Sequence, residues 1–382
     1  MKRFFSYTIL SFFLLLLPTG QASANNNDSI RLSLLTCAPG EEIYSLFGHT
    51  AIRYENSSQG IDVVFNYGLF SFNTPNFIFR FSLGETDYQL GATDYERFAA
   101  EYAFFGRSVW QQTLNLTDEE KTELIRLLQE NYRPENRVYR YNFFYDNCAT
   151  RPRDKIEESI AGKVIYPAEP QDGSLTFRDI VHQYCKGHPW ARFGIDLCIG
   201  SEADQPITQR QMMFAPFYLM DAFDGAQIKG DSIQRPLITA NELVVDATPE
   251  PDESDWMPTP LQCSLLLFIL TAAATIYGIR RRTGLWGIDL FLFGIAGIVG
   301  CVLAFLALFS QHPAVSSNFL LLVFHPGQLL FLPYIIYCVR KGKKCWYLTL
   351  NLAVLTLFIV LFPVIPQRFD FAVVPLALVL LI

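Results

Sequence analysis

One cysteine lies in a sequence context suited to nucleophilic chemistry. Cys148 follows Tyr-Asn-Phe-Phe-Tyr-Asp-Asn and precedes Ala-Thr-Arg-Pro-Arg-Asp. A β-rich run at 139–144 and a helix expected just after the cysteine, with Pro152 in its first turn, place the thiol at a strand-to-helix junction. Unpaired amides and the helix dipole lower a thiol pKa there, and Arg151 and Arg153 add positive charge. The sequence therefore predicts a reactive thiolate.

A cysteine nucleophile also needs a base, and three histidines precede the long apolar runs: His49, His182 and His188. His49 opens a β-rich run after a Phe-Gly turn, so its side chain can project over a neighbouring helix N-terminus. With Cys148 it would form a thioester-making pair in which the imidazole moves the protons. The other two flank Cys185, a cluster that suggests a metal site, but a surface loop is the favoured interpretation. No spacing resembles a zinc site, and we expect neither a metal nor another cofactor.

A third polar group usually orients the histidine of such a pair. Asn66 is the first choice because it falls on the strand after the histidine, with Asp62 behind it, although an ordinary sheet role is the alternative. Asn147 or the backbone amide of Cys148 could contribute to an oxyanion hole. Arg151 is a further supporting candidate.

The remaining cysteines leave structural alternatives open. Of the eight cysteines, four fall in or beside the apolar runs near the C-terminus, where a small apolar side chain suffices. Cys185 and Cys198 could pair in an oxidising compartment. A disulfide between Cys37 and Cys148 is the structural alternative to a catalytic thiol.

The elements that must position these groups predict an α+β domain. Alternating, β-rich runs at 30–35, 49–54 and 62–67 are bounded by glycine turns. The capping-box spacing at Thr117–Glu120, followed by leucines on one face, predicts a helix up to residue 131. We expect an antiparallel sheet with helices packed against it.

Targeting signals divide the chain into four parts. Residues 1–24 have the basic start, apolar stretch and Ala-Ser-Ala end of a signal peptide, with an uncleaved membrane helix as the alternative. Residues 25–245 form the expected exported domain, and the acidic, proline-rich composition of segment 246–260 predicts a linker. Residues 261–382 are the expected transmembrane domain.

Five apolar runs make up that last part. The expected membrane segments are 261–279, 285–310, 319–339, 345–365 and 369–382. Spanning takes roughly 20 apolar residues, so the last run is too short unless it borrows neighbours. The basic joints after the first and third runs predict a cytoplasmic location for these joints and for the C-terminus.

Composition supports a membrane protein. Apolar residues make up 51% of the 382 residues and charged residues 18%, and the net charge is −7. A wholly soluble or disordered chain is disfavoured, and without a basic stripe we expect no nucleic-acid partner. Asp289 inside the second run and His312 at its outer end are functional candidates, or simple interfacial residues.

Several motifs carry a resemblance to one family. Gly48-His49-Thr50, Asn66-Tyr67-Gly68 and the segment from Asp146 to Arg151 resemble the N-terminal periplasmic domain of the Lnb family. The stretch 182–200 and the apolar tail, with Ser-Gln-His-Pro at 310–313, also look like that family. Histidine before cysteine resembles permuted papain-like enzymes, such as NlpC-type peptidases and lecithin:retinol acyltransferase-like proteins. The resemblance implies a permuted papain-like (NlpC/LRAT-like) α+β periplasmic domain, followed by an all-α five-helix transmembrane domain in a bacterial inner membrane.

The resemblance also implies an activity, lipoprotein N-acylation. Cys148 would take a fatty acyl chain from a phospholipid as a thioester, and His49 would activate the thiol. The α-amine of a diacylglyceryl-cysteine lipoprotein would then accept the chain, and the membrane helices would give both lipids an apolar place to enter. Two alternatives remain: a membrane-tethered cysteine peptidase or amidase acting on cell-wall peptide, and a non-catalytic interaction module with a structural Cys148.

Overall fold

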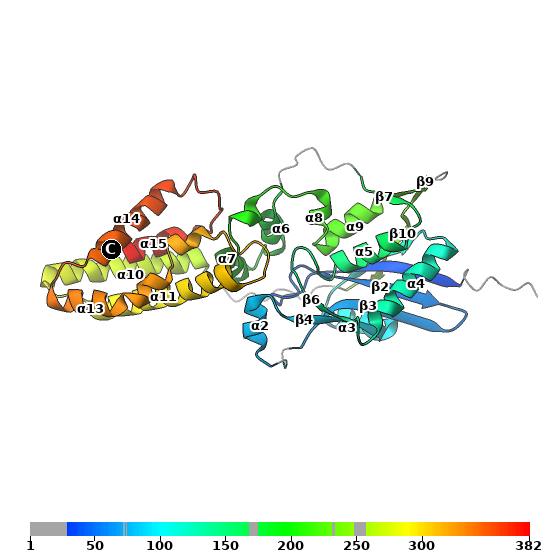
Figure 1. The fold of residues 1–382 in the computed structure, drawn as a ribbon, viewed down its shortest axis with the longest axis horizontal. Coiled ribbons are helices and arrows are strands. Elements are labelled where there is room, and N and C mark those ends of the chain that lie inside the picture. Colours follow the sequence, from blue (N-terminus) through cyan, green and yellow to red (C-terminus); the bar gives the residue numbers. More distant parts are fainter. Residues whose placement is uncertain (1–28, 72, 74, 168–174, 231–233, 248–256) are drawn as a thin grey trace, which may run out of the picture.

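The computed structural model describes residues 29–71, 73, 75–167, 175–230, 234–247 and 257–382. The predicted signal peptide at 1–24 and most of the predicted linker at 246–260 lie outside the described residues. A sheet-containing part and a bundle of helices follow one another along the long axis of the molecule (Figure 1).

An antiparallel sheet of seven strands organises the first part, in the order β10-β5-β1-β2-β3-β4-β6. Its strands are β1 (Ile30–Cys37), β2 (His49–Asn56), β3 (Ile61–Leu69), β4 (Asp87–Asp94), β5 (Val109–Leu114), β6 (Val138–Arg140) and β10 (Ile238–Val245). The first three confirm the predicted strands. The strand predicted at 139–144 is shorter, because Asn142 and Asp146 pair with each other in a turn. A small second sheet contains β7 (Lys163–Ile165), β8 (Gln227–Lys229) and β9 (Gln234–Pro236).

Helices cover both faces of the large sheet. They are α2 (Phe77–Leu83), α3 (Tyr95–Phe104), α4 (Asp118–Tyr132), α5 (Thr150–Ser159), α6 (Phe177–Tyr184), α7 (Pro189–Cys198), the 3-10 turn η2 (Ser201–Asp204), α8 (Gln209–Met212) and α9 (Pro216–Asp224). One face packs Leu32 and Ile52 against Leu124 of α4 and Ile156 of α5. The other packs Val64 and its neighbours against α3. The α+β prediction is confirmed.

Local sequence signals explain two of these helices, and the prediction for a third region is correct only in part. Thr117 caps α4: its hydroxyl accepts from the Glu120 amide, and the Glu120 carboxylate accepts from the Thr117 amide. The helix predicted just after Cys148 is α5. The surface loop expected around residues 182–188 is confirmed in part: residues 182–184 are the end of α6, and residues 185–188 form a turn that leads to α7, although Cys185 in this turn is buried.

The second part is helical but is not five straight spans. It contains α10 (Pro260–Arg281), α11 (Trp286–Phe309), the 3-10 turn η3 (Phe319–Leu322), α12 (Pro326–Leu330), α13 (Leu332–Lys341), α14 (Trp346–Leu361) and α15 (Val373–Leu381). Among the described residues, α10 and α11 are long and apolar enough to cross a membrane. The expected third span is bent by 73° between α12 and α13, where Pro333 lacks an amide hydrogen to continue the helix. With 16 and nine residues, α14 and α15 are shorter than a full span.

One end of the large sheet faces the helical part. At this end of the sheet, the last residue of β1, Cys37, lies between His49, the first residue of β2, and Val109, the first residue of β5. Val109 in turn pairs with Val245, the last residue of β10. The same edge therefore holds the ends of β1 and β10 and the starts of β2 and β5. From this end α2 reaches α11: the rings of Phe79 and Phe305 lie 5.9 Å apart. The basic joints lie at the opposite end of the bundle, where Gly284 packs against Val339 (Figure 1).

A buried ionic network joins the two parts. Arg178, with no exposed surface, donates to Asp196 (2.6 Å) and Asp204 (2.9 Å) and to two backbone carbonyls. Arg368, which lies between α14 and α15, donates to the same Asp204 at 2.9 Å and to Asp179. Because both arginines share one carboxylate, the helical part is tied to the core of the sheet-containing part.

We predict that Arg178→Ala lowers the free energy of unfolding by about 3 kcal/mol, because it removes the fully buried guanidinium from Asp196 and Asp204 and leaves each carboxylate with one remaining partner, His182 or Arg368. Denaturant titration of the detergent-solubilised protein measures this change. The matched control is Arg126→Ala, which removes a solvent-exposed pair with Glu123 and is expected to change the free energy of unfolding far less, because water and salt screen such pairs. Equal losses in the two variants would contradict the structural role of the network.

Candidate active site

His49 is oriented by the neighbouring strand. It is the first residue of β2, and its Nε2 lies 2.6 Å from Oδ1 of Asn66 on β3. An amide oxygen only accepts hydrogen bonds, so Nε2 carries the hydrogen and Nδ1 keeps its lone pair. The structure thus brings together the two residues that the sequence placed on adjacent strands, and it leaves Nδ1 able to accept a proton.

Gly68 brings the cysteine beside this histidine. A Cβ atom on Gly68 would lie 3.5 Å from Cβ of Cys148 and 3.8 Å from Cε1 of His49. The backbone of Gly68 has φ of +94°, a conformation that residues with a side chain rarely adopt. Cys148 and His49 therefore flank one glycine, which keeps the space between them open.

Asn147 holds the turn that presents the cysteine. Its Oδ1 accepts from the amides of Ala149 (2.8 Å) and Thr150 (2.9 Å) at the start of α5. Its Nδ2 donates to two backbone carbonyls, at 2.8 and 2.9 Å. The side-chain amide is fully used, so the oxyanion role suggested for this side chain does not fit. The backbone amide of Cys148 is the remaining candidate from the sequence.

The thiolate expected at Cys148 is not favoured by the structure. Burial raises the pKa of the thiol to about 11, although the Thr50 backbone and the cysteine's own amide lower it. The charges expected to help are neutralised by other partners. Arg151 pairs with Asp146 at 2.6 Å, and Arg153 pairs with Asp154 at 2.8 Å. Desolvation therefore outweighs the helix terminus, and Cys148 is a neutral thiol at pH 7.

The imidazole is neutral as well. Burial lowers the pKa of His49 to about 4; the hydrogen bond that its Nε2–H donates to Asn66 raises the pKa, and the positive charge of Arg107 lowers it further. Arg107 also donates from Nε to the Ala38 carbonyl at 2.8 Å, which holds it at this end of the sheet. The sequence analysis missed Arg107, because the Gly-Arg turn before β5 belongs to no catalytic motif. A neutral thiol beside a neutral imidazole is a pair in which the proton moves only as a substrate reacts.

Asp62 lies outside the site. In the register of β2 and β3, Asp62 is opposite Glu55, whereas Asn66 is opposite Ala51 near the start of β2. Its carboxylate accepts two hydrogen bonds from Arg53, at 2.8 and 2.6 Å. The expectation that Asp62 supports Asn66 is wrong, since three residues of extended strand separate them.

The cysteine alternatives are also corrected. All eight cysteines lie in the described part of the chain and are free. Cys37 is buried opposite His49, and burial raises the pKa of its thiol to about 12. Neither the pair of Cys37 with Cys148 nor the pair of Cys185 with Cys198 forms a disulfide.

The two membrane candidates lie in other places. Nε2 of His312 is 2.6 Å from the Phe81 carbonyl, so this histidine joins the end of α11 to α2. Asp289, in the first turn of α11, lines a cavity of about 420 Å³ between α10, α11 and α15. The C-terminal Ile382 lines the same cavity, which therefore lies at the end of the bundle away from the sheet.

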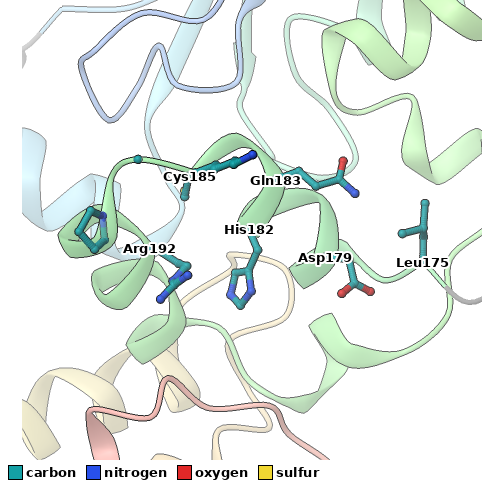
Figure 2. A pocket seen from close by; sticks show the side chains of 9 residues that line it. Leu175, Asp179, His182, Gln183, Cys185 and Arg192 are labelled. Carbon is teal, nitrogen blue, oxygen red and sulfur yellow. The ribbon is translucent and has the colours of Figure 1, made fainter. Parts of the chain in front are cut away.

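A separate cavity of about 410 Å³ lies beside α6 and α7, with His182, Asp179, Cys185 and Arg192 on its wall (Figure 2). His182 Nε2 lies 2.9 Å from both carboxylate oxygens of Asp196. Within the residues that the structure describes, no group of three His, Cys, Asp or Glu side chains is placed to hold a metal ion. This histidine is part of the ionic network that joins the two parts.

We predict that iodoacetamide alkylates Cys148 slowly at pH 7, with a rate that rises about tenfold per pH unit up to pH 10, as expected for a thiol with a high pKa. Peptide mapping by mass spectrometry follows this site, with Cys148→Ser as the control for assignment. A rate that is already maximal at pH 7 would show a resting thiolate instead.

Comparison with known families agrees with this arrangement. Residues 20–182 match the model of the Lnb N-terminal periplasmic domain, and residues 252–382 match the Lnb transmembrane domain. Neither a curated protein nor a solved structure matches the chain. The first match contains His49, Asn66 and Cys148, and the second covers the helical part. The two matches together show that this is a membrane protein with a periplasmic N-terminal domain. The chain belongs to the Lnb family.

Proposed function

We propose that this protein is a lipoprotein N-acyltransferase that uses Cys148 as its nucleophile. The observation that carries the proposal is the placement of Cys148 and His49 around Gly68, at the end of the sheet that faces the helical part. A nucleophile at this position is close to the membrane surface, where both lipid substrates are held.

The neutral pair suits a two-step transfer. As the Cys148 sulfur attacks the ester carbonyl of a phospholipid, Nδ1 of His49 takes the thiol proton. The tetrahedral oxyanion accepts a hydrogen bond from the Cys148 amide. The lysophospholipid alcohol then leaves with the proton from His49, and the acyl chain remains as a thioester.

The second step uses the same residues in the same roles. The free α-amine of a diacylglyceryl-cysteine lipoprotein attacks the thioester carbonyl, and His49 removes a proton from the amine. Collapse of the tetrahedral intermediate forms the amide bond and expels the Cys148 sulfur, which takes from His49 the proton that the imidazole removed from the amine. A buried site favours the amine over water as the acceptor, because it limits hydrolysis of the thioester.

The proposal extends to fold class and topology. A cysteine at the start of a helix, a histidine on an adjacent strand and an asparagine on its Nε2 support a permuted papain-like domain. The family models and the location of the basic joints, at the far end of the bundle from the periplasmic domain, support cytoplasmic joints and a cytoplasmic C-terminus in the bacterial inner membrane. In that topology the exported domain spans residues 25–245, and the helical domain 261–382 crosses the membrane an odd number of times.

We predict that cells carrying Cys148→Ala lose the amide-linked acyl chain of their lipoprotein N-termini, which mass spectrometry measures directly. Cys198→Ala is the matched control, because this free, half-buried cysteine lies on α7. Normal abundance of both variants is required. Triacylated N-termini in the Cys148→Ala strain would overturn the proposal, and altered cell-wall peptides there would favour an amidase instead.

We predict that Asn66→Ala lowers kcat roughly 10- to 100-fold with little change in KM, because the imidazole loses the acceptor that fixes its tautomer. Single-turnover transfer from phospholipid to a diacylated peptide measures this effect. Asn241→Ala, at an exposed position on β10, is the control. If Asn66→Ala keeps full activity while His49→Ala loses it, Asn66 does not orient the base.

A further inference from the structure

Exposed aromatic and aliphatic side chains gather at the end of the sheet that carries the site. The apolar rim, as we call this set, comprises the large apolar residues exposed on the loop before β2, on α2 and at the end of α3: Ile43, Tyr44, Ile78, Phe79, Phe81, Phe104 and Phe105. Phe104 and Ile78 expose 82% and 80% of their surface. Elsewhere on the described sheet-containing part such residues are exposed singly or in smaller numbers, as at Ile61. A concentrated patch of this kind marks an interaction surface.

The rim is continuous with the transmembrane domain. The carbonyl of Leu83, the last residue of α2, accepts from the Gln311 amide at 2.8 Å, just beyond the end of α11. Phe79 meets Phe305 of α11, and His312 bonds the Phe81 carbonyl. Because α11 is apolar enough to cross the bilayer and ends beside α2, the membrane surface meets the rim.

Charged residues next to the apolar rim limit how deeply it can enter a bilayer. Glu41 and Glu42 directly precede Ile43, and the carboxylate of Glu41 is 83% exposed. Arg80 on α2 is paired with Asp87 at 2.6 Å. Aromatic side chains with charged neighbours favour the headgroup region over the bilayer centre.

We propose that the apolar rim inserts into the outer leaflet and forms the entrance through which acyl chains pass from the bilayer to the site. The occupant is the phospholipid bilayer itself. Neighbouring aromatic rings lead inward: the ring centroids of Tyr44 and Phe70 lie 6.0 Å apart in an edge-to-face arrangement, and those of Phe70 and Tyr88 lie 5.0 Å apart. Phe70 and Cys148 pack against the same core. The entrance role rests on the proposed acyl transfer, whereas the insertion of the rim does not.

Tryptophan quenching in vesicles tests the insertion. Full-length Phe104→Trp and Ile78→Trp variants are reconstituted in phosphatidylcholine vesicles with or without bromine on the acyl chains near the headgroup. The parent protein, with its five tryptophans, supplies the background. The matched control is Ile61→Trp, an exposed position at the opposite end of the sheet, where β3 begins. Exchanging exposed apolar side chains for tryptophan leaves the core unchanged.

We expect brominated lipid to quench roughly half of the added fluorescence at positions 104 and 78, and none at position 61, because only the rim reaches the leaflet. Equal quenching at all three positions, or none at 104 and 78, would overturn the inference. The measurement needs no turnover. Quenching at the rim in a protein that fails to acylate lipoproteins would therefore support insertion of the rim and contradict the proposed acyltransferase function. Acyl transfer without quenching would support the function and contradict the insertion.

Discussion

The approach of the turn before α5 to the sheet at Gly68 is the contact on which the rest of the site depends. A glycine with positive φ leaves no side chain between the cysteine and the histidine. Asn147 holds the other side of this contact, since its amide group bonds four backbone groups. Backbone pairing of β2 with β3 then sets Asn66 beside His49. Three side chains distant in sequence thus converge through rigid backbone elements, as preorganised catalysis requires.

Burial decides the protonation of this pair. The helix terminus and nearby arginines would favour a thiolate, but each arginine is paired with its own carboxylate. Desolvation destabilises the charged thiolate more than the backbone hydrogen bonds at the helix terminus stabilise it. The same desolvation lowers the pKa of His49. A neutral resting pair also protects the thiol from oxidation in the periplasm, because the thiolate is the form that oxidants attack.

The ionic network between the two parts fixes the position of the candidate site relative to the helical part. Arg178 and Arg368 share Asp204, and the Asn318 amide donates to the Leu197 carbonyl at 2.7 Å. The bonds from Arg178 and Asn318 are partly buried, so salt screens them less than it screens the exposed bond from Arg368. A second contact between the two parts is formed by α2, which packs against α11. With contacts on both sides, the periplasmic domain is held in one orientation relative to the helical part.

Sequence by itself determined the elements with local signals. Alternation predicted β1 to β3, and the capping box predicted α4, because strand periodicity and helix caps depend on neighbours in the chain. The junction at Cys148 and the adjacent strands of His49 and Asn66 suggested the candidate site. Only the tertiary structure decided the charge states, the partners of Arg151, Asp62 and Asn147, the bend in the third apolar run and the burial of Cys185 in the turn between α6 and α7. These features arise from contacts between residues far apart in sequence: burial raises the pKa of a thiol only when other elements cover it, and a carboxylate supports a site only when the register places it there.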